Sequence, residues 1–93
     1  MMMALILFLA YCIVAKMFIV AKENPKTPEG WAYFKNFEVI DNQSVPINTI
    51  IFEHAQIFHT KEEAIQVYWL VCQYFHGYKV YPYSIIRGTK KYV

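Results

Sequence analysis

Charged residues are scarce in this 93-residue sequence, because Asp, Glu, Lys and Arg make up 17% of it, against the roughly 25% usual for soluble domains. Glycine is scarce as well: there are three, and none belongs to a glycine-rich loop of the kind that binds phosphates. The two cysteines, Cys12 and Cys72, lie far apart in the chain and leave no evident disulfide within one domain. A chain of this length has room for one small core. These features exclude multidomain enzymes and doubly wound nucleotide-binding folds.

Apolar side chains are abundant instead, at 57% of the residues, and they concentrate at the start of the chain. Residues 1–15 contain no charged side chain, and the apolar run continues to Ala21 after the single Lys16. As an α-helix, residues 1–15 would span about 22 Å and residues 1–21 about 31 Å, whereas the hydrocarbon core of a bilayer is about 30 Å thick. We therefore predict a single transmembrane helix over residues 1–21, with the Lys16 stem reaching towards the headgroups.

Two other interpretations of this segment stay open. Residues 4–15 match the length of the apolar region of a cleaved signal peptide. However, no basic residue precedes this stretch, and the triplets that end at Ala15 and Ala21 lack a small first residue. The third interpretation is a buried helix or strand of a soluble or complex-bound fold.

Basic residues set the expected orientation of the membrane helix. Lys16, Lys22 and Lys26 lie at its C-terminal end, and no basic residue precedes it. Because cytoplasmic flanks of membrane helices are enriched in Lys and Arg, we expect a single-pass membrane protein whose C-terminal domain is cytoplasmic.

The rest of the chain is predicted to form one small domain. Residues 22–30 contain two prolines and a glycine and read as a linker. Residues 31–40 are rich in aromatic and β-branched side chains and predict a strand. Turn-forming residues at 41–46 then lead to a second strand over residues 47–59, antiparallel to the first.

A helix is predicted to begin after Thr60, because Thr60 and Glu63 have the spacing of a capping box. Gly77 is expected to end this helix, and residues 78–87 are predicted to form a third strand, at an edge because Pro82 cannot donate to a ladder. The expected fold is therefore α+β, a ββαβ domain over residues 31–87 with an antiparallel sheet, one packed helix and a basic tail at 88–93. The apolar stripe that packs this helix on the sheet is predicted to be Ala64, Val67, Tyr68, Val71 and Phe75.

No cluster of residues predicts catalysis, a cofactor or a metal. His54 and His59 would face opposite sides of a strand, because their separation is odd. Cys72 lies within the apolar pattern of the helix and not at a helix N-terminus, where a thiolate is stabilised. We therefore expect a protein that is not an enzyme and holds no cofactor and no metal.

Exposed aromatic residues are the best candidates for recognition, because Trp and Tyr are enriched at interface centres. A second use for tyrosines beside Lys79, Arg87, Lys90 and Lys91 is base stacking on nucleic acid, which the net charge of only +2 makes unlikely. The same basic residues suit anionic headgroups. The predicted partner-binding residues are Tyr68, Trp69, Tyr78, Tyr81 and Tyr83.

The sequence thus predicts a small membrane-anchored accessory or regulatory protein, whose partners are membrane lipid and a membrane-associated protein. Anchoring raises the local concentration of such a module near its partner. The alternatives are a secreted or periplasmic binding domain released from a signal peptide, and a soluble nucleic-acid-binding module.

Overall fold

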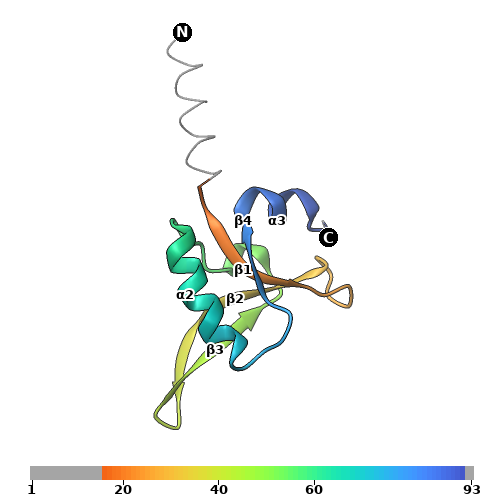
Figure 1. Ribbon diagram of the computed structural model, residues 1–93. Helices are drawn as coiled ribbons and strands as arrows, with labels where there is room; N and C mark the ends of the chain where they lie inside the picture. The colour runs from red at the N-terminus through yellow and green to blue at the C-terminus, as the bar shows by residue number, and fades with distance from the viewer. Residues whose placement is uncertain (1–15, 92–93) are drawn as a thin grey trace.

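The computed structural model describes residues 16–91, which form a four-stranded sheet with helical elements on both faces (Figure 1). All strand pairings are antiparallel, and the order is β3-β2-β1-β4. The α+β class and the antiparallel sheet are therefore confirmed. The elements in chain order are β1 (Phe18–Glu23), β2 (Trp31–Ile40), β3 (Gln43–Thr49), the 3₁₀ helix η1 (Phe52–His54), α2 (Lys61–Cys72), β4 (Lys79–Pro82) and α3 (Tyr83–Thr89).

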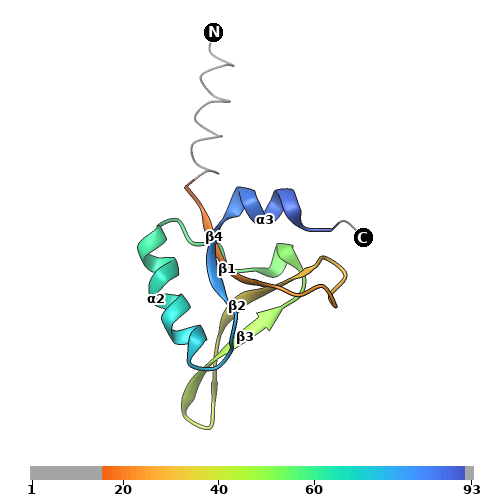
Figure 2. The same cartoon turned by 45° about the vertical axis from the view of Figure 1, so that its right-hand side comes forward.

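Strand β1 lies inside the sheet and supplies side chains to two separate cores. Val20 packs with the residues under α2, whereas Ile19 and Ala21 pack with η1 and α3. This division follows from the strand period of two, which points successive side chains to opposite faces. Figure 2 shows the result, with α2 on one side of the sheet and η1 and α3 on the other. The fold therefore has three layers.

The predicted strand at residues 31–40 and the predicted helix start are confirmed. The Thr60 hydroxyl accepts a hydrogen bond of 3.2 Å from the Glu63 amide, which satisfies one of the unpaired amides at the helix N-terminus. Ala64 and Val71 are fully buried against the sheet, and Val67, Tyr68 and Phe75 pack beside them. The helix itself ends at Cys72.

The predicted membrane helix is wrong for its last four residues. Phe18–Glu23 is a strand in which Ile19, Val20 and Ala21 are completely buried. A short apolar run has no period that separates a buried strand from a helix, and β-branched residues favour the strand. Residues 1–15 lie outside the described part of the chain. Within residues 16–91, neither helix has the length and the apolar character that crossing a bilayer requires.

The predicted linker at residues 22–30 is instead a tight connection between paired strands. Lys22 and Glu23 continue β1, where they pair with Ala32 and Trp31 of β2. The residues between them form a loop that is closed by a 2.9 Å hydrogen bond from the Asn24 amide to the Gly30 carbonyl oxygen. This loop holds the two strands in one sheet.

The predicted second strand, over residues 47–59, is also wrong in its bounds. Asp41 and Asn42 have φ values of 51° and 65°, so they form a tight two-residue hairpin turn and β3 starts directly after them, at Gln43. Strand β3 ends at Thr49, and Phe58 returns to the sheet in an isolated bridge with Phe18. Because β3 lies at the edge, it tolerates Pro46.

The predicted strand at residues 78–87 is correct only for Lys79–Pro82. From Tyr83 onward the chain forms α3, which buries Ile86 completely in the second core. Gly88, which was expected in the tail, lies inside this helix. The structure thus corrects the ββαβ order by adding a strand at the start and a helix at the end.

Candidate functional site

The five aromatic residues predicted to bind a partner do not gather on one surface. Tyr68 and Tyr78 belong to the core under α2, whereas Tyr81 and Tyr83 pack against the core under α3. The Tyr81 ring contacts the Trp31 ring edge-on, with centroids 5.1 Å apart. Trp69 alone of the five is largely exposed, at 64%.

Tyr78 is a core residue, with 4% of its surface exposed. Burial raises the pKa of its hydroxyl from 10.0 to about 12, because the charged phenolate is poorly solvated there. A partner has no access to this ring in the fold, so we leave Tyr78 out of the candidate surface.

The outward side of α2 carries an apolar patch. Ile65, which is 37% exposed, lies one turn before Trp69. Leu70, the residue after Trp69, is 47% exposed. The Trp69 ring contacts the Tyr68 ring edge-on at 5.3 Å. A side-chain hydrogen bond with Cys72, one turn further on, raises the pKa of the Tyr68 hydroxyl. We call Ile65, Trp69, Leu70 and Tyr74 the α2 outer face.

A shallow groove continues the α2 outer face towards the sheet. Its volume is about 230 Å³, and it lies between Leu70 and Tyr74 on one side and Phe37 and Ser44 on the other. The Tyr74 hydroxyl donates a 3.3 Å hydrogen bond to the Ser44 carbonyl oxygen across the groove. Most of its lining is apolar, so it suits a hydrophobic side chain.

The charges on α2 are asymmetric. Glu62 and Glu63 lie in the first turn, and α2 contains no Lys or Arg after Lys61. Helix α2 therefore carries all of its charges in its first turn, where the two glutamates outnumber Lys61, and none at its C-terminal end.

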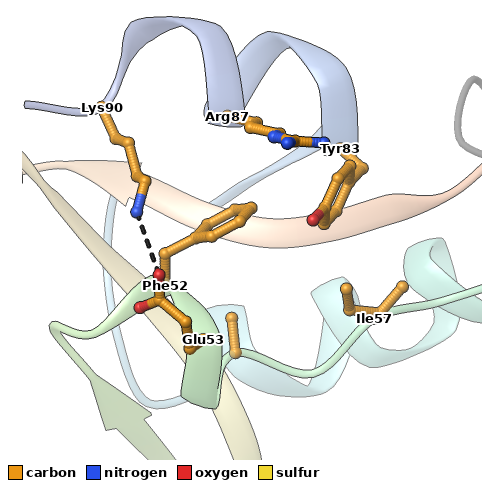
Figure 3. Close-up of a pocket in the computed structure, with 7 residues that line it drawn as sticks. Phe52, Glu53, Ile57, Tyr83, Arg87 and Lys90 are labelled. Carbon is orange, nitrogen blue, oxygen red and sulfur yellow. Dashed lines mark hydrogen bonds and ion pairs between the residues drawn. The ribbon is translucent and has the colours of Figure 1, made fainter. Parts of the chain in front are cut away.

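A second concave region lies between η1 and α3 (Figure 3). Its volume is about 500 Å³. The Lys90 ammonium lies 3.3 Å from Oε1 of Glu53 and 4.8 Å from the centre of the Phe52 ring. Hydrogen bonds from its own backbone amide and from Lys90 hold the pKa of the Glu53 carboxyl below its usual value. This pocket is lined by Phe52, Glu53, Ala55, Ile57, Tyr83, Arg87 and Lys90.

The starts of α2 and α3 lie beside the point where the chain enters the described fold. The backbones of Phe18 and Phe58 exchange two hydrogen bonds of 2.8 Å, and Phe58 lies shortly before α2. The Tyr83 amide, at the start of α3, donates a 2.8 Å hydrogen bond to the Met17 carbonyl oxygen. Figure 1 shows both helices starting at this end, with the β2–β3 hairpin tip at the opposite end.

Comparison of the chain with protein families, with curated proteins and with solved structures gave no match.

The three lysines predicted to orient the chain at a membrane are separated by the fold. Lys16 is exposed at the entry point. Lys22 lies six residues further along an extended strand, about 20 Å away, where its side chain packs against Gly77. Lys26 is exposed in the β1–β2 loop. Of these three, Lys16 alone lies beside residues 1–15.

Arg87, a basic residue near the C-terminal end of the chain, belongs to a helix at the entry end instead. Arg87 is exposed on α3, which runs across the same end of the molecule in both views (Figures 1 and 2). The sequence placed Arg87 in a strand, so its position on a helix at the entry end was not predicted. The turn into α3 after Pro82 creates it.

The histidines stay apart. His54, His59 and His76 are exposed in different segments. Within residues 16–91, no three His, Cys, Asp or Glu side chains come together in a metal-binding arrangement.

Proposed function

We propose that this chain is a membrane-tethered interaction module that binds the juxtamembrane segment of a protein in the same membrane. The opening residues supply the tether, and the α2 outer face supplies the contact. The module performs no chemistry of its own. Its mechanism is to hold a binding surface at the bilayer, where tethering raises the effective concentration for the partner.

The observation that carries this proposal is the exposure of Trp69 on a rigid helix. Ala64 and Val71, on the opposite side of α2, are fully buried against the sheet, so the helix has little freedom to turn. Trp69, Ile65 and Leu70 thus remain in water in the isolated chain. A Trp that is held in place loses little conformational entropy on binding, and Trp residues dominate many interface energies.

The charge pattern of α2 favours a basic and apolar partner segment. Glu62 and Glu63 lie at the end of the helix that is closest to the entry point, and Trp69 and Leu70 lie further away. Cytoplasmic segments that leave a membrane helix are rich in Lys and Arg. Such a segment, running outwards along α2, would place its basic residues beside the glutamates and its apolar residues on Trp69 and in the groove.

The tether must be shorter than the sequence alone indicated. Because Lys16 lies in a turn and Phe18 begins β1, residues 1–15 remain for a membrane helix, and they would span about 22 Å. Fifteen residues is just below the roughly 17–25 that cross a bilayer, so the proposed tether requires the bilayer to thin locally around it. Lys16 then lies just after the helix, where its ammonium reaches the headgroups directly.

Cleavage of a signal peptide would have different consequences at the two possible cleavage positions, after Ala15 and after Ala21. Cleavage after Ala21 would remove most of β1, on which both cores depend. Cleavage after Ala15 would leave every described element intact. The mature N-terminus therefore distinguishes the tethered module from a released binding domain, and a start at residue 16 would contradict the tether.

Site-specific photocrosslinking in membranes tests the contact. A photoreactive residue replaces Trp69 in one full-length chain and Val39, which is 74% exposed at the distant hairpin tip, in another. We expect position 69 to crosslink a peptide that contains Lys or Arg and apolar residues and lies within about 20 residues of a membrane span. Equal crosslinking at positions 39 and 69, or a crosslinked peptide without these features, would overturn the proposed contact.

A further inference from the structure

Helix α3 lies across the end of the molecule at which the uncharged opening segment joins the fold. The Tyr83 amide and the Met17 carbonyl oxygen are 2.8 Å apart, so the first residue of α3 touches the residue just before β1. Residues 1–15, which carry no charge, end two residues earlier. If they enter a bilayer, α3 is held within a few residues' reach of its surface.

The side of α3 that faces away from the sheet has the composition of an interfacial helix. Ile86 is fully buried and fixes the inner side. At 100° per residue, Ser84 and Gly88 then lie opposite Ile86, with Ile85 on one flank and Arg87 on the other. Ile85 is 51% exposed, and a Cβ added at Gly88 would meet no atom within 4 Å. The outer side is therefore flat, with the exposed Ile85 on one flank and, on the other, the exposed Arg87, which also lines the pocket between α3 and η1.

The charges carried by α3 and by the two residues after it have one sign. Residues 83–91 contain Arg87, Lys90 and Lys91 and no acidic residue. Lys90 is committed to the fold, because 9% of its side chain is exposed and it pairs with Glu53. Arg87 and Lys91 are exposed, as is Lys16 at the entry point. By contrast, Glu62 and Glu63 make the start of α2 acidic.

We propose that α3 lies flat on an anionic bilayer surface, with Ile85 in the headgroup region and Arg87, Lys91 and Lys16 beside lipid phosphates. Anionic lipids attract basic residues near the surface, and a buried apolar side chain adds to this attraction. The inference rests on the proposed tether, which brings α3 to the bilayer. It goes further by naming the element that contacts the lipid and so fixing the orientation of the domain on the bilayer.

A fluorescent label that reports on polarity tests this contact in the full-length chain. Cys12 and Cys72 are changed to Ser, and an environment-sensitive dye is attached to I85C or, as a positional control, to V39C. The proteins are reconstituted into phosphatidylcholine vesicles with and without phosphatidylglycerol. We expect the dye at position 85 to shift to the blue in the anionic vesicles only, and to lose the shift in high salt, which screens the charges. The dye at position 39 stays in water in both.

A matched pair of charge variants shows whether the basic residues of α3 are responsible. The test variant carries R87E and K91E, and the control carries K35E and K79E, two exposed lysines on β2 and β4 with the same change in net charge. We expect the test variant to abolish the shift at position 85 and the control to keep it, with unchanged far-ultraviolet circular dichroism in both. A test variant that unfolds is replaced by R87Q with K91Q, for which we expect a several-fold smaller shift.

The outcomes separate the two proposals. Flotation of the vesicles shows whether the chain is bound to them. If the chain floats with both kinds of vesicle but the dye at position 85 gives the same signal in each, α3 does not bind anionic lipid and the tether stands. If the chain floats only with anionic vesicles and the test variant abolishes flotation, α3 binds lipid and the tether is wrong. Loss of the shift in the control variant, or a shift at position 39 equal to that at position 85, overturns the inference.

Discussion

The Tyr33 hydroxyl donates a hydrogen bond of 2.8 Å to Oε1 of Glu29. The same carboxylate oxygen accepts a 3.0 Å hydrogen bond from the backbone amide of Phe52. One side chain from the β1–β2 loop therefore connects β2 to η1 beneath α3. The Tyr33 side chain is completely buried, and burial together with the bond to Glu29 raises the pKa of its hydroxyl.

Replacing Glu29 is expected to destabilise the domain. Glu29→Ala removes both hydrogen bonds and leaves the buried Tyr33 hydroxyl without this acceptor, which costs about 1–3 kcal/mol. Glu29→Gln keeps an acceptor oxygen and is expected to cost less than half as much. Urea unfolding of the full-length chain in a mild detergent, followed by circular dichroism, measures both values. Equal losses for the two variants would show that the charge matters and the acceptor does not.

The start of α2 could be predicted from sequence because its signal is local. Thr60 and Glu63 are three residues apart, and the hydrogen bond between them needs no other part of the chain. The position of β1 is a tertiary property. Ile19 and Val20 suit a bilayer and a buried strand equally well, and only pairing with β2 and β4 decides between the two. The sequence contains no local signal of that pairing.

The two candidate surfaces, on α2 and on α3, also differ in how far the sequence could predict them. The exposure of Trp69 follows from its place on α2 opposite Ala64 and Val71, and the period of the helix predicted it. The position of Arg87 depends on the chain turning into a helix after Pro82 and on Ile86 filling the second core. Tyr78, Tyr81 and Tyr83 were assigned to one strand and proposed together as partner-binding residues, but Tyr78 and Tyr81 pack in different cores on opposite sides of the sheet.

The role of β1 is tested by a substitution in its centre. Ile19→Ala removes a completely buried side chain and is expected to lower the free energy of unfolding by about 2–5 kcal/mol. Ile65→Ala, at a position that is 37% exposed on α2, serves as the matched control and is expected to cost about 1 kcal/mol or less. Urea unfolding of the full-length variants gives the comparison. A small effect at Ile19 would mean that β1 is not part of the folded core.

The contact between α3 and η1 depends on packing more than on charge. Lys90 lies over the Phe52 ring with 9% of its side chain exposed, whereas 67% of the Glu53 side chain is exposed. We expect Lys90→Ala to cost about 1–2 kcal/mol through loss of the packed stem and the cation–π contact. Glu53→Gln should cost less than Lys90→Ala, because exposed ion pairs contribute little. Thermal unfolding at low and high salt measures both, and a larger loss for Glu53→Gln would reverse this ranking.

The alkaline limit of stability is expected to depend on Tyr78. Its pKa rises from 10.0 to about 12 in the fold, so the folded state keeps the hydroxyl proton at pH values at which the unfolded state has lost it. The resulting stability is complete below pH 10.0, the ordinary value, and is lost as the pH rises through about 12. Tyr33, whose pKa is also raised, acts in the same direction.

Tyr78→Phe keeps the buried ring and removes the titrating hydroxyl. We therefore expect the free energy of unfolding of the variant to fall less steeply with pH above the ordinary tyrosine pKa than that of the unsubstituted chain. Urea unfolding at a series of alkaline pH values measures the two slopes, and the ultraviolet absorbance of tyrosinate reports ionisation in the folded state. Parallel slopes would contradict the prediction, since they would mean that the Tyr78 hydroxyl ionises as readily in the fold as in the unfolded chain.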